Sequence, residues 1–213
     1  EADMFMKLLA ERLTTAIFAV PAVYQALRLH PDFEQIDFAS IPSWGSGGAA
    51  LPDTVVEIFL TKGVRICQGW GMTETGPSIL FQTPLDAETK LGSVGRPLML
   101  SETRIVGPDG ADVRQGEAGE LLVRGPLITP GYWNRPDSNS ETFGDGGWMR
   151  TGDIARKDAD GCYYIVDRIK DMYISGGENV FPAAPAAVAV NVLGSTPALI
   201  TANSASSSLI TCN

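Results

Sequence analysis

The sequence has few of the residues on which common catalytic and structural frameworks depend. Its 213 residues include one histidine, His30, so a Ser-His-Asp or Cys-His catalytic site has no second candidate base. The three cysteines are odd in number and share no CxxC spacing, which argues against a disulfide framework and against a zinc knuckle. We therefore interpret the cysteines as structural and do not expect a hydrolase triad.

Positive charge and long apolar runs are also scarce. The chain has 16 Lys and Arg against 25 Asp and Glu, a net charge of −9, and no basic cluster, so neither nucleic acid nor an anionic membrane is the expected partner. No run of 18 apolar residues occurs, and residues 1–10 carry acids where a signal peptide needs a basic region. With 44% hydrophobic residues the chain can still build a core, and we expect a soluble protein of the cytoplasm.

All 23 glycines lie in residues 45–213 and none lies before them, so the first part is rich in regular elements and the rest is rich in turns. Apolar spacing predicts helices over residues 3–12, 21–30 and 52–62, and strands over 15–20, 41–44 and 64–68. This alternation predicts an α/β fold with a largely parallel sheet. Short alternating runs at 103–106, 120–124 and 162–166 then predict a small antiparallel β unit.

The segment CQGWGMTETGP, residues 67–77, is predicted to form a loop directly after a buried strand, and ligands of α/β sheets bind at the C-terminal ends of strands. Trp70 could cover an aromatic base, Thr73 could bond a phosphate oxygen, and the Glu74 carboxylate could hold Mg²⁺. The alternative is an ordinary turn with Glu74 in solvent. Two familiar phosphate-binding patterns, GxxxxGK[ST] and GxGxxG opening a helix, are missing.

A second candidate site lies in residues 148–182. Thr151-Gly152-Asp153 is predicted to form a tight turn whose carboxylate could accept two hydrogen bonds from a ribose diol. A hairpin turn at 160–161 would return Arg168 to the same ligand. The alternative interpretation of residues 167–171 is a solvated run of charges.

Four motifs resemble, in their order along the chain, the core motifs of the adenylate-forming enzymes. They are GWGMTETG, GELLVRGP with GYWNRP, GWMRTGD and DRIKDMYISGGENVFP. Within that superfamily the chain is most similar to the AMP-forming acyl-CoA ligases, and to fatty-acyl-CoA synthetases in particular. The resemblance covers about residues 14–182. It implies activation of a carboxylic acid by ATP to an acyl-adenylate and pyrophosphate, followed by transfer of the acyl group to the CoA thiol.

The resemblance also implies the cofactors and partners. They are ATP or AMP, Mg²⁺ and coenzyme A, with a small carboxylic acid, fatty or aryl, as substrate. Neither nucleic acid nor a transmembrane segment is implied, and a homodimer is left open.

The matching positions imply residue roles. Residues that line the adenine and acyl pockets or contact the nucleotide are Gly47, Gly48, Ala49, Gln68, Gly69, Trp70, Thr73, Asp153 and Arg168. Tyrosine is common in the family where Trp70 stands, so we expect stacking on adenine to be kept, while the width of the pocket is left open. Asp153 and Arg168 would hold the ribose hydroxyls.

Three residues match positions that take part in catalysis. Thr73 would contact phosphate, Glu74 would be the magnesium ligand, and Lys170 would be the hinge between adenylation and thioester formation. Gly176 and Gly177 would lie in the loop that approaches coenzyme A.

The sequence departs from the family in two places. It contains no Pro-Lys-Gly phosphate loop, and residues 183–213, which carry no charged residue, replace the charged helix that usually follows ENVFP. We interpret residues 1–90 as an α/β nucleotide- and acyl-binding subdomain, 91–166 as a β-rich subdomain, 167–182 as the hinge and the start of a C-terminal domain, and 183–213 as an atypical tail. The chain thus corresponds to the back part of a large N-terminal domain, and alone it is expected to be inactive.

Two alternatives remain open at this point. An adenylation domain of the peptide-synthetase type would be favoured by a carrier-protein domain after the chain. A non-catalytic nucleotide- or acyl-binding module would lack a phosphate loop encoded upstream.

Overall fold

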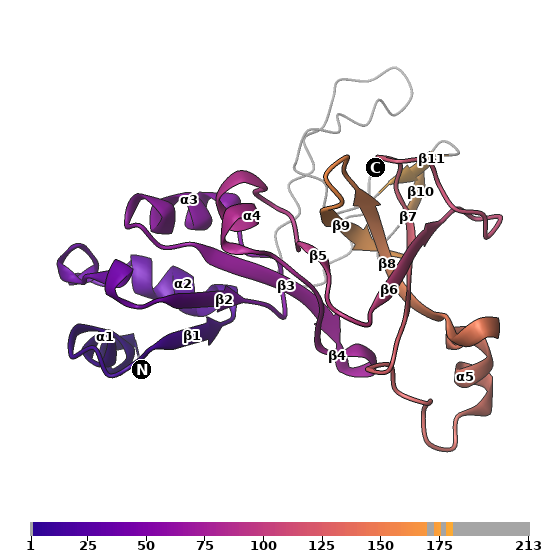
Figure 1. The fold of residues 1–213 in the computed structure, drawn as a ribbon, viewed down its shortest axis with the longest axis horizontal. Coiled ribbons are helices and arrows are strands. Elements are labelled where there is room, and N and C mark those ends of the chain that lie inside the picture. Colours follow the sequence, from indigo (N-terminus) through magenta and orange to yellow (C-terminus); the bar gives the residue numbers. More distant parts are fainter. Residues whose placement is uncertain (1, 170–172, 176–177, 181–213) are drawn as a thin grey trace, which may run out of the picture.

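Two β-sheets lie side by side in the computed structural model, which describes residues 2–169, 173–175 and 178–180 (Figure 1). The first sheet has the strand order β1-β2-β3-β4-β5, and the second has the order β6-β7-β8-β9. A separate antiparallel pair is formed by β10 (Tyr173–Ser175) and β11 (Glu178–Val180). The predicted α/β class with a smaller antiparallel unit is confirmed.

The first sheet is mixed. Its strands are β1 (Ala16–Ala19), β2 (Ser43–Ser46), β3 (Ile66–Met72), β4 (Gly76–Phe81) and β5 (Arg96–Pro97). The first three strands are parallel, while β4 and β5 run antiparallel to their neighbours. The helices of this part are α1 (Ala2–Ala10), α2 (Pro21–Arg28), α3 (Asp53–Thr61) and α4 (Pro84–Thr89).

An aromatic cluster is the core beneath the parallel strands. Its rings are those of Tyr24, Phe33, Phe38, Trp44 and Phe59, with centroids 4.9 to 6.3 Å apart, mostly in tilted or edge-to-face pairs. The Tyr24 hydroxyl donates to the Gly45 carbonyl at 2.6 Å, so the one buried polar atom of that ring is paired. The cluster fixes α2 and α3 on β2, and thereby sets where β2 and β3 end.

The second sheet is entirely antiparallel, with the strands β6 (Glu102–Val106), β7 (Gly119–Arg124), β8 (Met149–Lys157) and β9 (Tyr163–Arg168). Helix α5 (Pro136–Thr142) lies between β7 and β8 in sequence and buries none of its residues. The core of this sheet includes Ile79 and Leu80 from β4, so the first sheet contributes directly to the second core. The division into subdomains at residue 90 stays a prediction.

A short segment, residues 93–95, joins the two sheets. The Val94 N–H donates to the Tyr163 carbonyl at 2.9 Å, and the Tyr163 N–H donates to the Gly95 carbonyl at 2.8 Å. On the other side, a Cβ at Gly95 would lie 2.0 Å from the carbonyl group of Phe81, and Gly95 has a φ of +84°. Only glycine fits this position, because both its conformation and its contact with β4 exclude a side chain.

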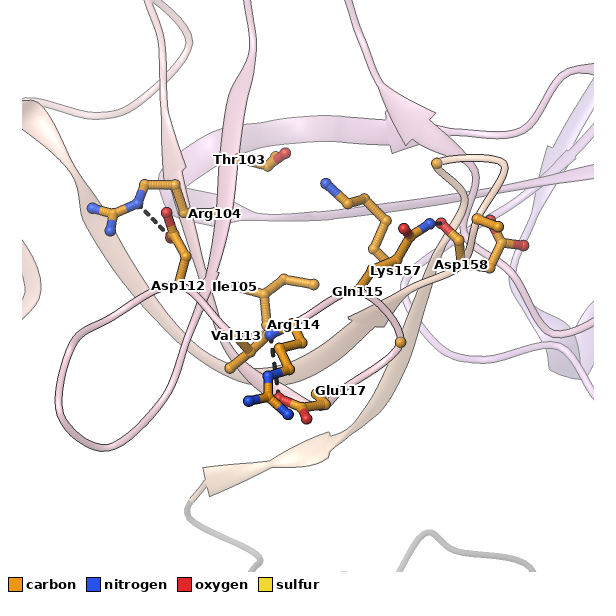
Figure 2. Close-up of a pocket in the computed structure, with 13 residues that line it drawn as sticks. Thr103, Arg104, Ile105, Asp112, Val113, Arg114, Gln115, Glu117, Lys157 and Asp158 are labelled. Atoms are coloured by element: carbon orange, nitrogen blue, oxygen red, sulfur yellow. Dashed lines mark hydrogen bonds and ion pairs between the residues drawn. The ribbon is translucent and has the colours of Figure 1, made fainter.

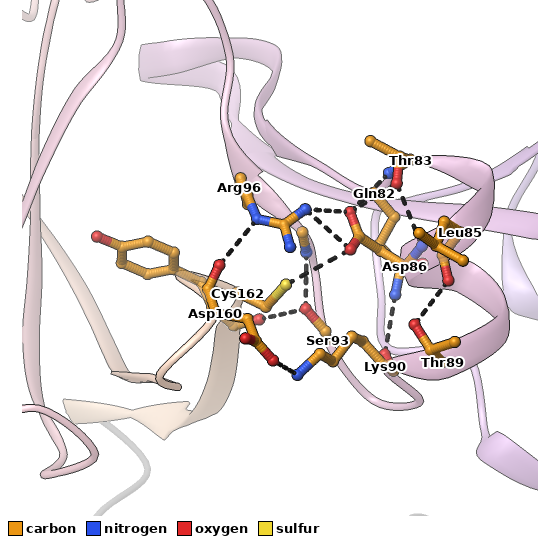
Figure 3. A network of polar contacts seen from close by, with 12 residues as sticks. Gln82, Thr83, Leu85, Asp86, Thr89, Lys90, Ser93, Arg96, Asp160 and Cys162 are labelled. Atoms are coloured by element: carbon orange, nitrogen blue, oxygen red, sulfur yellow. Dashed lines mark hydrogen bonds and ion pairs between the residues drawn. The ribbon is translucent and has the colours of Figure 1, made fainter.

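Polar side chains reinforce the junction (Figure 3). Arg96 donates from Nη1 to both carboxylate oxygens of Asp86, at 2.8 and 2.6 Å, and from Nε to the Asp160 carbonyl at 3.1 Å. Lys90 pairs with Asp158 at 3.0 Å and also with Asp160. The network therefore ties α4 and the neighbouring segment to the β8–β9 turn of the second sheet.

The predicted elements of the first part are confirmed, with ends that differ by one to a few residues. Two local predictions were wrong. Residues 151–153 lie inside β8 and not in a turn, and most of 67–77 belongs to β3 and β4, with only a 3₁₀ turn at Thr73–Thr75 between them. Cys67 and Cys162 are buried free thiols, in line with a structural role. Among the described residues, no helix is long and apolar enough to cross a membrane.

Candidate active site

Asp153 is held between two predicted nucleotide-contacting residues. The Trp70 indole Nε1 donates to Asp153 Oδ2 at 2.8 Å, although the two residues are 83 positions apart in sequence. The other carboxylate oxygen, Oδ1, lies 3.2 Å from Arg168 Nε. The structure thus brings together Trp70 from the first sheet with Asp153 and Arg168 from the second.

The local shape of β8 explains how Asp153 reaches this position. Asp153 pairs directly with Arg168 across β8 and β9, as the predicted hairpin requires. On the other side, the register with β7 jumps from Ile154 to Arg150, so residues 151–153 form a bulge in β8. Gly152 has a φ of +72°, a left-handed conformation that glycine adopts without steric cost. The bulge, and not the expected turn, presents the carboxylate.

The Asp153 carboxylate is deeply enclosed, with 4% of the residue exposed. Burial raises the pKa of Asp153 above its usual range, while the Trp70 hydrogen bond and the Arg168 charge act in the opposite direction. The Asp153 N–H donates to Thr151 Oγ1 at 3.0 Å, and that hydroxyl donates to the Leu121 carbonyl at 2.7 Å. These bonds fix the backbone of the bulge.

Thr73 and Glu74 lie in the 3₁₀ turn that follows β3, a few residues beyond Trp70. The turn is closed by Thr75, whose Oγ1 accepts the Met72 N–H at 2.9 Å. Thr73 is exposed and Glu74 is half-buried. Both side chains therefore follow the C-terminal end of β3, which is where a sheet of this kind presents ligand-binding groups.

Tyr132, which is not among the predicted site residues, contacts Glu74. The Tyr132 hydroxyl donates to Glu74 Oε1 at 2.7 Å. Tyr132 belongs to the GYWNRP motif that carries part of the resemblance, and this motif was the available signal. Nothing in the local sequence links it to a residue 58 positions earlier.

The side chain of Gln68 is bonded to the loop that follows β2. Gln68 Oε1 accepts the Leu51 N–H at 3.2 Å, which anchors the end of the loop that contains Gly47, Gly48 and Ala49. A Cβ at Gly47 would lie 2.8 Å from the Phe18 ring. The aromatic ring that packs on this glycine is therefore a side chain of the protein and not part of a ligand.

Gly69 is confined in the same way. A Cβ there would lie 2.5 Å from the Phe81 ring. Both glycines thus have a packing role, whatever ligand contacts they also make.

The remaining predicted site residues, Lys170, Gly176 and Gly177, lie outside the described residues. Their predicted roles stay predictions.

A separate pocket of about 460 Å³ lies on the second sheet (Figure 2). Its lining includes Arg104, which donates to Asp112 Oδ1 at 2.8 Å, and Gln115, which donates to the Asp158 carbonyl at 3.2 Å. None of the predicted site residues lines it. Arg104 pairs with Asp112, and Asp158 pairs with Lys90 outside the pocket, and we assign the pocket no ligand.

The model of the family described as AMP-binding enzyme matches residues 1–133, which is more than half of the chain. The chain belongs to the AMP-binding enzyme family. Its curated relatives in the family include a feruloyl-CoA synthase from Amycolatopsis sp, 42% identical over 169 residues, which make up 79% of this chain and 34% of the relative.

A second curated relative is the long-chain-fatty-acid–CoA ligase FadD13 of Mycobacterium tuberculosis. It is 37% identical over 196 residues, or 91% of this chain and 38% of the relative. The chain spans about a third of the length of the curated relatives it matches.

Solved structures of family members superpose on the chain. The o-succinylbenzoate CoA synthetase of Bacillus subtilis, in complex with its acyl-adenylate intermediate, gives a TM-score of 0.77 at 34% identity, covering 86% of this chain and 37% of that one. A fatty acyl CoA synthetase from Mycobacterium tuberculosis gives 0.76 at 36% identity, covering 90% and 38%. The arrangement of the two sheets is therefore that of adenylate-forming enzymes.

Proposed function

We propose that the protein containing this chain is an AMP-forming acid–CoA ligase. It activates a fatty or aryl carboxylic acid with ATP to an acyl-adenylate and then transfers the acyl group to the thiol of coenzyme A. The observation that carries the proposal is the contact of Trp70 with the buried Asp153–Arg168 pair, at the end of the strand that leads to Thr73 and Glu74. The family membership and the CoA ligases among the relatives support the same chemistry.

Asp153 and Arg168 are the groups proposed to bind the ribose. An ionised carboxylate accepts hydrogen bonds at both oxygens, as a vicinal diol requires, and the guanidinium adds donors beside it. Trp70 offers a ring face for the adenine base, and its N–H keeps the carboxylate oriented. Gln68, Gly69 and the loop of residues 47–49 complete the proposed pocket wall.

Thr73 and Glu74 are proposed to act on the phosphates. The described residues hold no cluster of three or more acidic, His or Cys side chains that could bind a metal alone. A single carboxylate such as that of Glu74 fits Mg²⁺, which is commonly held by one or two carboxylates together with substrate phosphates. When bound, Mg²⁺ offsets the charge that builds on the phosphate oxygens during attack by the acid. The exposed Thr73 hydroxyl can donate to one of these oxygens.

The thioester step is proposed to use Lys170 as the hinge and Gly176 and Gly177 near coenzyme A. We place the protein in the cytoplasm, where ATP and coenzyme A are both supplied. The homodimer stays a prediction.

Asp153→Asn in the full-length protein tests the proposal. The amide keeps the size of the side chain and removes the charge and one acceptor, so we expect AMP and ATP to bind about tenfold to a hundredfold more weakly. Calorimetry with AMP measures the binding, and pyrophosphate exchange with a panel of acids measures the adenylation. Asp112→Asn, which removes an exposed ion pair of the same sheet, is the matched control and should change neither.

The possible results test the ribose assignment and the alternative of a non-catalytic binding module. Unchanged AMP affinity in Asp153→Asn would contradict the ribose assignment. AMP binding by the wild-type protein without exchange for any acid would favour a non-catalytic binding module.

A further inference from the structure

The carboxylate of Glu74 is held by a segment far from it in sequence. The loop between β7 and α5 passes beside the turn after β3 (Figure 1). There the Tyr132 hydroxyl donates to Glu74 Oε1 at 2.7 Å, and the Thr129 N–H donates to the Glu74 carbonyl at 2.8 Å. Both the backbone and the side chain of Glu74 are therefore fixed by the same loop.

Tyr132 is itself anchored by α5. The Tyr132 N–H donates to Asn139 Oδ1 at 2.6 Å, and Asn139 Nδ2 donates back to the Tyr132 carbonyl at 3.0 Å. The preceding Gly131 has a φ of +148°, and a Cβ there would lie 3.1 Å from Asn139 Oδ1. The Tyr132 ring also packs against Phe143, with centroids 5.7 Å apart. These contacts leave the phenol little freedom.

We propose that Tyr132 is a positioning residue, which holds one oxygen of the Glu74 carboxylate so that the other is directed to the cation and phosphates. This inference rests on the proposed function of Glu74 and extends it to the residue that holds its carboxylate. A free glutamate side chain loses rotamer entropy when it is fixed, and a preformed hydrogen bond removes much of that cost from binding. Groups that orient a ligating carboxylate typically change metal affinity about tenfold or more.

The surroundings of Tyr132 agree with this role. The hydrogen bond to Glu74, together with burial, raises the pKa of Tyr132 above its usual value. A phenol whose pKa lies above its ordinary value is protonated at neutral pH, so Tyr132 can donate this hydrogen bond there.

Tyr132→Phe in the full-length protein removes the donor and keeps the ring. The matched control is Tyr163→Phe, which removes a hydroxyl that lies 2.8 Å from Thr103 Oγ1 in the second sheet. Binding of Mn²⁺ in the presence of a non-hydrolysable ATP analogue, followed by electron paramagnetic resonance, is the first readout. We expect Tyr132→Phe to weaken Mn²⁺ binding about tenfold, and Tyr163→Phe to leave it within twofold.

The same measurement in a Glu74→Gln background separates positioning from a general structural effect. If Tyr132 acts through Glu74, Tyr132→Phe has no further effect on Mn²⁺ binding once Glu74 is replaced. Three outcomes would overturn the proposal. The first is an equal loss of Mn²⁺ binding in both backgrounds, and the second is unchanged Mn²⁺ binding in Tyr132→Phe. The third is a loss of affinity for the ATP analogue, measured without metal, as large as the loss of Mn²⁺ binding.

A second readout needs no ligand. Titration of tyrosinate by ultraviolet absorbance should show one tyrosine that ionises at lower pH in Glu74→Gln than in the wild type, and this shift should vanish when Tyr132→Phe is added. Absence of the shift overturns the contact itself. If no acid supports pyrophosphate exchange while the shift is observed, the proposed ligase function fails and the Tyr132–Glu74 contact stands.

Discussion

Asp153 is the residue whose environment most constrains the candidate site. Its pKa is raised by burial, so the folded protein retains a proton at a pH where the unfolded chain has released it. Asp153 alone therefore makes the folded state less stable as the pH rises from the ordinary carboxyl pKa to the raised one. Any donor to the ionised carboxylate reduces this penalty, and the Trp70 indole is such a donor.

Trp70→Phe tests this dependence. The variant leaves a buried carboxylate with one donor fewer, and we expect it to lower the free energy of unfolding by about 1–3 kcal/mol at neutral pH. Urea denaturation measures the change. Trp133→Phe, at a side chain that is 90% exposed, is the control and should stay within about 0.5 kcal/mol. In an Asp153→Asn background the cost of Trp70→Phe should fall, and an undiminished cost would contradict the account.

At the scale of elements, α4 shows how a short helix is held in place. It has six residues, too few to be stable alone, and its N-terminus is closed by reciprocal hydrogen bonds between Thr83 and Asp86. Burial raises the pKa of Asp86, but hydrogen bonds from Thr83 and Arg96 outweigh it and hold the pKa below its usual value. The stability that Asp86 contributes is present above the ordinary carboxyl pKa and is lost as the pH falls through the lowered one.

Arg96→Gln removes the guanidinium from this buried carboxylate. We expect the free energy of unfolding to fall by about 2–4 kcal/mol at neutral pH. On acidification the variant should lose less further stability than the wild type, because the stabilising charge pair is already gone. Urea denaturation between neutral and acidic pH measures both. Arg104→Gln, which breaks an exposed pair with Asp112, should cost about 0.5 kcal/mol. Equal losses in the two variants would show that the α4 network adds nothing beyond a surface ion pair.

At the scale of the molecule, the candidate site lies where the two sheets meet. Trp70 comes from the first sheet and Asp153 from the second, and the backbone between them passes through residues 93–95. The second core also contains side chains of β4, so a change at the junction reaches both sheets.

Gly95→Ala should therefore disturb the whole molecule. The new methyl group would overlap the backbone of Phe81, which cannot move without shifting β4. We therefore expect the free energy of unfolding to fall by at least about 3 kcal/mol. Gly110→Ala is the control, since Gly110 has a similar φ of +76° but nothing within 4 Å, so only about 1 kcal/mol of backbone strain is expected. Thermal unfolding compares the two, and similar losses would mean that the contact with β4 is unimportant.

The sequence predicted what depends on local pattern. Helices with an apolar stripe, such as α3, and the pairing of Asp153 with Arg168 around a hairpin turn both follow from spacing. Helix α5 was missed because it buries no residue and has no apolar stripe. The bulge at Gly152 was taken for a turn because both use a left-handed glycine.

Contacts between distant segments were not predictable from local pattern. The sequence placed Trp70 and Asp153 in one site through the resemblance, but it gave no sign that they bond to each other. Tyr132 and Glu74 meet through a loop whose path depends on the second sheet and on α5.

The contact of Trp70 with Asp153 also provides an optical signal. The chain has three other tryptophans: Trp44 is buried in the aromatic core, Trp133 is exposed, and Trp148 lies beneath arginine side chains. Trp70 is the one whose indole N–H is bonded to the proposed ribose-binding carboxylate. Its fluorescence therefore depends on the charge and occupancy of Asp153, and a chain that retains Trp70 alone among its tryptophans would report the arrival of a nucleotide without any added dye.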